Sequence, residues 1–170
     1  GRIPQHSGAL SFDPFHEGVP TLTSVLREHG YYTAAIHKTE HMQPPSCFPW
    51  DRQWVGKERQ PSLYGDAVRD AIAEARALKR PFFVNCNIND PHRPFYGSAQ
   101  AAEIDHHEEG EYKVAREVKA EDVQVPPFLE DFPDIRRELA QYSNSAQRMD
   151  ISIGKAVDAV AACPKAEDTD

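Results

Sequence analysis

The first half of the chain alternates between amphipathic segments and short apolar runs. Apolar residues recur at helical spacing over Pro20–Gly30, where Thr21 is suited to the N-cap position. The β-prone and nearly uncharged run Tyr31–Ile36 follows at once and indicates a buried strand. The same order repeats with a helix predicted over Asp66–Leu78 and a strand over Phe82–Ile88. Helices followed directly by strands predict a parallel or mixed sheet that is covered by helices.

The remaining segments are predicted to be loops and helices. Residues 42–62, which contain several prolines and two tryptophans, indicate an ordered loop, and residues 93–132 indicate mostly loop. Helices are expected over Asp134–Asn144 and Ala146–Ala162, the second with an apolar stripe formed by Met149, Ile153, Val157 and Val160. This order fits an α/β sandwich whose last strands lie outside the sequence. We therefore expect residues 1–170 to be an internal piece of one domain of a longer protein.

The charge balance argues against several classes of partner. The formal net charge is −8, which disfavours general binding to nucleic acid or to an anionic membrane. Residues 103–134 are strongly acidic and are expected to be solvated surface. No apolar run approaches the roughly 18 residues needed to cross a bilayer. The 3 cysteines have no metal-binding spacing, and Cys86 is expected to be a small buried hydrophobic residue.

Two polar clusters follow the two predicted strands. His37–His41 comes after Ile36, and Asn87–Pro94 comes after the run that contains Val84. If the strands are neighbours, Lys38, His41 and His92 can converge at the carboxyl edge of the sheet. A lysine and two histidines suit a tetrahedral oxyanion such as a sulfate or phosphate ester, because they supply positive charge, hydrogen-bond donors and a transferable proton. The alternative, that the histidines only occupy or cap surface loops, stays open.

Other polar residues carry weaker signals. His106 and His107 lie among acidic residues, and a solvated surface is favoured over a metal site there. Arg136, Arg137 and Arg148 are interpreted as exposed helix charges. The sequence has no GxxxxGKS or GxxxxGKT phosphate loop, no GxGxxG loop and no GxSxG nucleophile elbow. An enzymatic nucleophile is therefore expected outside this sequence.

Four stretches resemble motifs of the sulfatase family, within the alkaline-phosphatase-like superfamily, and they occur in the family's order. Gly1–Gly8 resembles TGxxPHxxG, and Gly18–Lys38 resembles the segment that ends in GYxTaxxGKxH. Pro81–Pro94 resembles PFFLxxxxxxPHxP, and Tyr142–Gly154 resembles YxAxvxxmDxxvG. The Asn-Asp-Pro-His-Arg version of the third motif is most similar to sulfamidases and related glycan sulfatases.

The resemblance implies a role for individual residues. Lys38 would grip the sulfate oxygens, His41 would be the histidine of the Lys-His pair, and His92 would be the acid that protonates the departing oxygen or nitrogen. Arg93 would contribute to substrate binding, whereas Tyr142 and Asp150 are assigned to packing or capping. The sequence departs from the family pattern at His37, where glycine is usual, and in the three-residue step from Lys38 to His41.

The resemblance also implies the rest of the enzyme. The expected fold is part of an alkaline-phosphatase-like α/β sandwich with a mostly parallel sheet. The expected activity is hydrolysis of sulfate esters or sulfamates, on a small molecule or a glycan, in a periplasmic, secreted or lysosomal protein. It would use a formylglycine and a divalent cation, usually Ca²⁺, whose ligands we do not find in this sequence, so the piece alone is expected to be inactive. The alternatives are a phosphatase or phosphodiesterase of the same superfamily and a non-catalytic glycan- or protein-binding relative.

Overall fold

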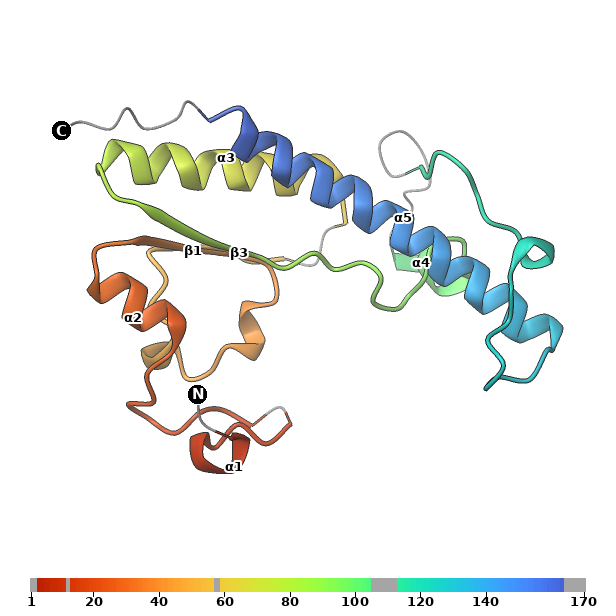
Figure 1. Ribbon diagram of the computed structural model, residues 1–170, viewed down its shortest axis with the longest axis horizontal. Coiled ribbons are helices and arrows are strands. Elements are labelled where there is room, and N and C mark those ends of the chain that lie inside the picture. The colour runs from red at the N-terminus through yellow and green to blue at the C-terminus, as the bar shows by residue number, and fades with distance from the viewer. Residues whose placement is uncertain (1–2, 12, 57–58, 105–112, 164–170) are drawn as a thin grey trace. The chain divides into compact units, whose positions relative to one another are not determined.

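A computed structural model describes residues 3–11, 13–56, 59–104 and 113–163 (Figure 1). The chain divides into two compact units, which we describe separately. The first unit comprises residues 1–57, 66–87 and 158–170, and the second comprises residues 58–65 and 88–157.

The first unit is built on a three-stranded parallel sheet. Its strands are β1 (Tyr32–Ile36), β2 (Arg52–Trp54) and β3 (Phe82–Cys86), in the order β2-β1-β3. The central strand β1 is buried over its whole length, as expected for a β-prone run without charge. The predicted α/β class is confirmed.

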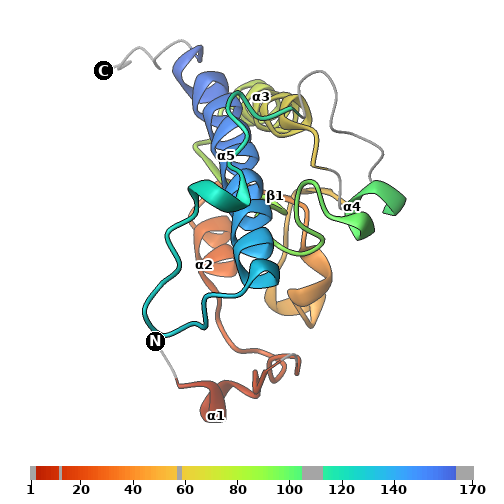
Figure 2. The same ribbon diagram turned by 90° about the vertical axis from the view of Figure 1, so that its right-hand side faces the viewer.

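Helices cover both faces of this sheet, with α2 (Leu22–Glu28) on one side and α3 (Pro61–Ala77) on the other (Figures 1 and 2). The predicted cap of α2 is confirmed, because the Thr21 hydroxyl accepts a hydrogen bond from the Ser24 amide at 3.2 Å. On α3, alanines at helical spacing pack against Tyr32 and Ala34 of the central strand. Their small side chains let the helix lie close to the sheet. A short helix, α1 (Pro4–Ser7), precedes α2.

A half-buried carboxylate, Asp51, links α2, β1 and the segment that precedes the start of β3. The amide and hydroxyl of Thr33 donate to one oxygen of Asp51, and the side chains of Arg27 and Arg80 lie within 3.3 Å of the same carboxylate. Burial alone would raise the pKa of Asp51, but the hydrogen bond from Thr33 and the two arginine charges outweigh it. The pKa of Asp51 therefore lies below its usual value, and the ionised carboxylate stabilises this unit.

The second unit is organised by one long helix, α5 (Pro133–Ala161), with α4 (Ala99–Ile104) and extended loops. The buried face of α5 is largely polar, and its side chains bind the loops that pass over it. The Asn144 side chain pairs with both the amide and the carbonyl of Val118, and the Ser145 hydroxyl accepts from the Tyr96 amide at 2.8 Å. Gly65, in the first turns of α3, lies where an added Cβ would meet the Lys155 carbonyl at 3.0 Å.

The polar inner face of α5 explains two wrong predictions. The sequence predicted two helices, whereas α5 is continuous through Ser145. The predicted apolar stripe does not form a core, because Ile153, Val157 and Val160 are exposed to 41%, 58% and 47%. Polar residues at helical spacing occupy the buried positions instead: Asn144, Ser145, Arg148 and Ser152.

The loop predictions were too broad. Residues 42–62 contain a 3-10 turn at Pro45–Cys47, the strand β2 and the start of α3. That helix begins at Pro61 and not at Asp66, since proline is favoured in the first turn, where its missing amide is not needed. The predicted loop 93–132 contains α4 and a 3-10 turn at Ala120–Asp122, and β3 ends at Cys86 and not at Ile88. His106 and His107 lie outside the described residues.

All three cysteines lie within the described residues. Cys47, Cys86 and Cys163 form no disulfide bonds. Cys86, which was expected to be buried, is half-buried, and burial raises its pKa to about 11. Among the described residues, no helix combines the length and the apolar character that a membrane crossing requires.

Candidate functional site

The turn after β1 has an uncommon backbone conformation. His37 and Lys38 both have left-handed φ values, +57° and +51°. Side chains other than glycine rarely adopt this region, because Cβ approaches the carbonyl oxygen. His37 therefore adopts a conformation that glycine takes at lower cost. Two adjacent residues in such a conformation point to a local functional constraint.

Asn87 holds this turn in place. It is the first residue after β3, and its side-chain amide donates to the carbonyls of Ile36 and His37 at 3.1 Å and 3.0 Å. Its backbone amide also donates to Ile36 at 2.9 Å, and the His37 amide donates to the Trp54 carbonyl at 2.8 Å. All three strands of the sheet therefore contribute to the geometry of the turn.

The first predicted cluster lies on this turn. Lys38 is half-buried and precedes the 3-10 turn Thr39–His41, in which Thr39 is buried and His41 is exposed. The structure therefore places Lys38 and His41 in one compact segment at the carboxyl end of β1.

The second cluster starts at the neighbouring strand. β1 and β3 are directly paired and parallel, and Ile36 lies opposite Cys86 in the register. The segments that lead to Lys38 and to the second cluster consequently leave the sheet at the same edge.

A buried ionic triad organises the loop that carries the second cluster. The Asp90 carboxylate receives hydrogen bonds from Arg148 Nε at 2.6 Å and Nη2 at 3.0 Å, and from Arg59 Nη1 at 2.8 Å. The side chains of Asp90 and Arg148 are 1% and 2% exposed, and that of Arg59 is 8% exposed. The prediction that Arg148 is an exposed charge was therefore wrong. We call these three residues the Asp90 triad.

The Asp90 triad is connected to the imidazole of His92 through one carbonyl. Arg59 donates from Nη1 to the Pro94 carbonyl at 2.8 Å and from Nη2 to the Arg93 carbonyl at 3.2 Å. The Arg93 carbonyl also lies 2.6 Å from Nδ1 of His92. A carbonyl oxygen can only accept, so Nδ1 carries a proton and Nε2 is the ring atom that exchanges a proton with a bound molecule.

Backbone amides of the loop also form hydrogen bonds that hold it in place. The His92 amide donates to the Asn89 carbonyl at 2.9 Å, and the Asn89 amide donates to the Tyr64 hydroxyl at 3.1 Å. His92 and Arg93 are both exposed. Arg93 forms an ion pair with Glu138, and its guanidinium lies 4.5 Å from the centre of the Phe95 ring.

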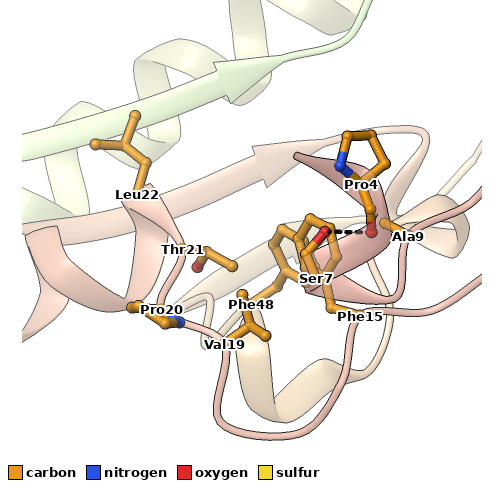
Figure 3. Close-up of a pocket in the computed structure, with 9 residues that line it drawn as sticks. All are labelled: Pro4, Ser7, Ala9, Phe15, Val19, Pro20, Thr21, Leu22 and Phe48. Carbon is orange, nitrogen blue, oxygen red and sulfur yellow. Dashed lines mark hydrogen bonds between the residues drawn. The ribbon is translucent and has the colours of Figure 1, made fainter. Parts of the chain in front are cut away.

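The first unit also contains a pocket, and none of the predicted site residues lines it. It has a volume of about 670 Å³, and the stacked rings of Phe15 and Phe48 form part of its wall (Figure 3). The Ser7 hydroxyl donates to the Pro4 carbonyl, and the Thr21 hydroxyl donates to the Cys47 carbonyl. The lining has no acid, base or cation, so this pocket is a poor candidate for catalysis.

A sulfatase would require a divalent cation and a formylglycine, and the described part of the chain has no residues that fit either group. Among these residues, no three His, Cys, Asp or Glu side chains gather where they could hold a metal ion. None of the three cysteines lies in a Cys-x-Pro-Ser-Arg sequence.

Comparisons with known proteins leave the family unassigned. No protein-family model matches the chain, and no curated protein sequence matches it significantly.

Sequence reasoning did not identify the residues that position the two clusters. In the sequence Asn87 is only one residue of a polar run, and no local pattern distinguishes Arg59 or Asp90. One signal for Arg148 was present, because no acidic residue lies three or four positions away and polar residues share its face of the helix at positions 144 and 152. Its partner Asp90 is 58 residues away, a pairing that local patterns do not reveal.

Proposed function

We propose that this chain carries the anion-binding and proton-donating part of a sulfuric ester hydrolase. The observation that carries the proposal is the pairing of Ile36 with Cys86, since it brings the segments that lead to Lys38 and His92 to one edge of a parallel sheet. The four sulfatase-like motifs favour sulfur over phosphorus as the centre that is attacked.

The proposed roles follow from side-chain chemistry. The ammonium group of Lys38 binds the oxygens of the sulfate and offsets the charge that develops on them. When the bond from sulfur to the ester oxygen or sulfamate nitrogen breaks, that atom takes the electron pair, and imidazolium His92 donates the Nε2 proton to it. His41 adds a hydrogen-bond donor to the sulfate oxygens. The nucleophile that attacks sulfur is not among the residues to which these roles are assigned.

Hydrolysis by the full-length protein tests this proposal. We expect turnover of 4-nitrophenyl sulfate to exceed that of 4-nitrophenyl phosphate. His92→Ala should lower turnover by about 100- to 10,000-fold, and most for substrates with poor leaving groups. Lys38→Ala should lower it by about 100- to 1,000-fold and weaken inhibition by inorganic sulfate.

Two residues of similar geometry serve as controls. His29 is exposed and its Nδ1 lies 2.8 Å from the Val25 carbonyl, and Lys79 is exposed with a left-handed φ of +53°. His29→Ala and Lys79→Ala should leave turnover unchanged. Faster hydrolysis of the phosphate ester, or losses in the control variants equal to those at Lys38 and His92, would contradict the proposal.

A further inference from the structure

A small pocket adjoins the loop that carries His92. One face of α5 forms its floor, and Arg93 and Phe95 form one wall. Its volume is about 240 Å³, below the range of roughly 300–1,000 Å³ typical of sites for drug-sized ligands. We call it the Tyr142 pocket, and the residues that matter for its chemistry are Arg93, Phe95, Leu129, Glu138, Leu139 and Tyr142.

The aromatic wall of this pocket is held in a defined orientation. The rings of Phe95 and Tyr142 meet edge to face, with their centres 5.6 Å apart and an interplanar angle of 81°. Phe95 is 9% exposed and one of its faces is covered by the Arg93 guanidinium, whereas Tyr142 is 46% exposed. Tyr142 therefore offers an accessible ring surface against which a ligand can stack.

The polar rim is electrically balanced. Arg93 and Glu138 form an ion pair whose side chains are 62% and 39% exposed, so both can still hydrogen-bond to a ligand. A carboxylate beside a guanidinium offers acceptors and donors side by side, which matches neighbouring hydroxyl groups. An anionic ligand would have to compete with Glu138 for Arg93, so charge complementarity favours an uncharged one.

We infer that the Tyr142 pocket binds one uncharged pyranose ring. The C–H face of the sugar stacks on Tyr142, its hydroxyls bind Arg93 and Glu138, and Leu129 and Leu139 complete the apolar surface. One part of the inference rests on the proposed function: the bound sugar ring lies next to the group that His92 protonates. The small volume suits one ring and not a macromolecular partner.

Saturation-transfer NMR on the full-length protein tests the inference directly. Methyl glucopyranoside and methyl galactopyranoside are the neutral probes, and methyl glucuronide is the anionic probe. We expect transfer from protein to the ring C–H protons of at least one neutral probe. Tyr142→Ala should reduce it at least about fivefold. Phe128→Ala should not, because Phe128 is 82% exposed and lies outside the pocket lining.

A second variant tests the charge argument. Glu138→Gln leaves Arg93 without its carboxylate partner, so the preference should move from the neutral probes toward methyl glucuronide. No transfer to either neutral probe from the folded protein, equal transfer in Tyr142→Ala, or a stronger signal from methyl glucuronide in the unaltered protein would overturn the inference.

The outcome is distinguishable from failure of the proposed function. Sugar binding without hydrolysis of 4-nitrophenyl sulfate would leave the pocket assignment standing and refute the proposed activity. Hydrolysis without sugar binding would do the reverse.

Discussion

Removing the negative charge from the Asp90 triad should destabilise the second unit strongly. The triad holds two guanidinium groups and one carboxylate, so its formal charge is 2 − 1 = +1. Asp90→Asn keeps the size of the side chain but leaves two buried cations without a counter-charge. Arg148→Met instead leaves a neutral pair between Arg59 and Asp90 at 2.8 Å.

The two substitutions should therefore differ in magnitude. Breaking a buried ion pair by removing one partner typically destabilises a protein by about 3–5 kcal/mol, because the remaining charge is uncompensated. We expect Asp90→Asn to fall in that range, since the carboxylate accepts three hydrogen bonds from the two arginines. Arg148→Met should be milder by about 1–2 kcal/mol, because the charges that remain cancel and methionine fills similar space.

Urea unfolding of the full-length protein, followed by a probe in the second unit, measures both effects. The matched control is Asp66→Asn, which removes the same charge from an exposed i, i+3 pair with Arg69 whose side chains are 62% and 60% exposed. That change should alter the free energy of unfolding by less than about 1 kcal/mol. If Asp90→Asn prevents folding altogether, Arg148→Met still tests the argument.

The triad also predicts the state of His92, which side-chain ¹⁵N NMR reports. In the neutral form the proton should reside on Nδ1, because the Arg93 carbonyl accepts a hydrogen bond from it. Arg59→Met should weaken this preference, because the Arg59 side chain no longer holds the Arg93 carbonyl in place. If Asp90→Asn lowers the free energy of unfolding by no more than Asp66→Asn does, the electrostatic account is refuted. An Nε2–H tautomer in the unaltered protein would refute the connection to His92.

Three further predictions follow from other sites. At pH 8 a thiol with a pKa of about 11 is roughly 0.1% ionised, so iodoacetamide should alkylate Cys86 about a hundredfold more slowly than a cysteine in an unfolded peptide, as measured by mass spectrometry; equal rates would contradict its burial. Because the pKa of Asp51 is lower in the folded state, its stabilisation is full above the ordinary value of 3.8 and is lost as the pH falls through the folded pKa. Asp51→Asn should therefore flatten the acid limb of stability against pH, and an unchanged limb would count against this. Gly8→Ala should destabilise by about 1–3 kcal/mol, since φ is +88° and the added Cβ would lie 2.4 Å from the His16 ring; Gly18→Ala, with φ of +75° and open space, should be milder in thermal unfolding.

The first unit was predictable because its signals are local. Thr21 caps a helix within three residues of itself, and the run Tyr31–Ile36 is β-prone and uncharged, so each element is specified by its neighbours in sequence. The strand β2 was missed because Arg52–Trp54 is too short and polar to show a pattern, and it is held by pairing with β1. Local signals were weak there, and tertiary contacts decide the structure.

The second unit was less predictable because its helix buries polar groups. Apolar periodicity assumes that the core is apolar, whereas α5 turns Asn144, Ser145 and Arg148 inward to bind loops. The residues that carry the proposed chemistry were suggested by their position after strands, but those that hold them, such as Asn87 and Asp90, bind partners remote in sequence. The left-handed backbone of His37 was not predicted, because local patterns associate this conformation with glycine.

The central claim is that Lys38 and His92 serve one anion, and a crystal structure of the full-length protein with bound sulfate tests it most directly. The account predicts that Lys38 Nζ and His92 Nε2 both lie at hydrogen-bond distance, about 3 Å, from oxygens of the same sulfate. A structure in which the two side chains open onto separate surfaces, with no single tetrahedral group within reach of both, would contradict it.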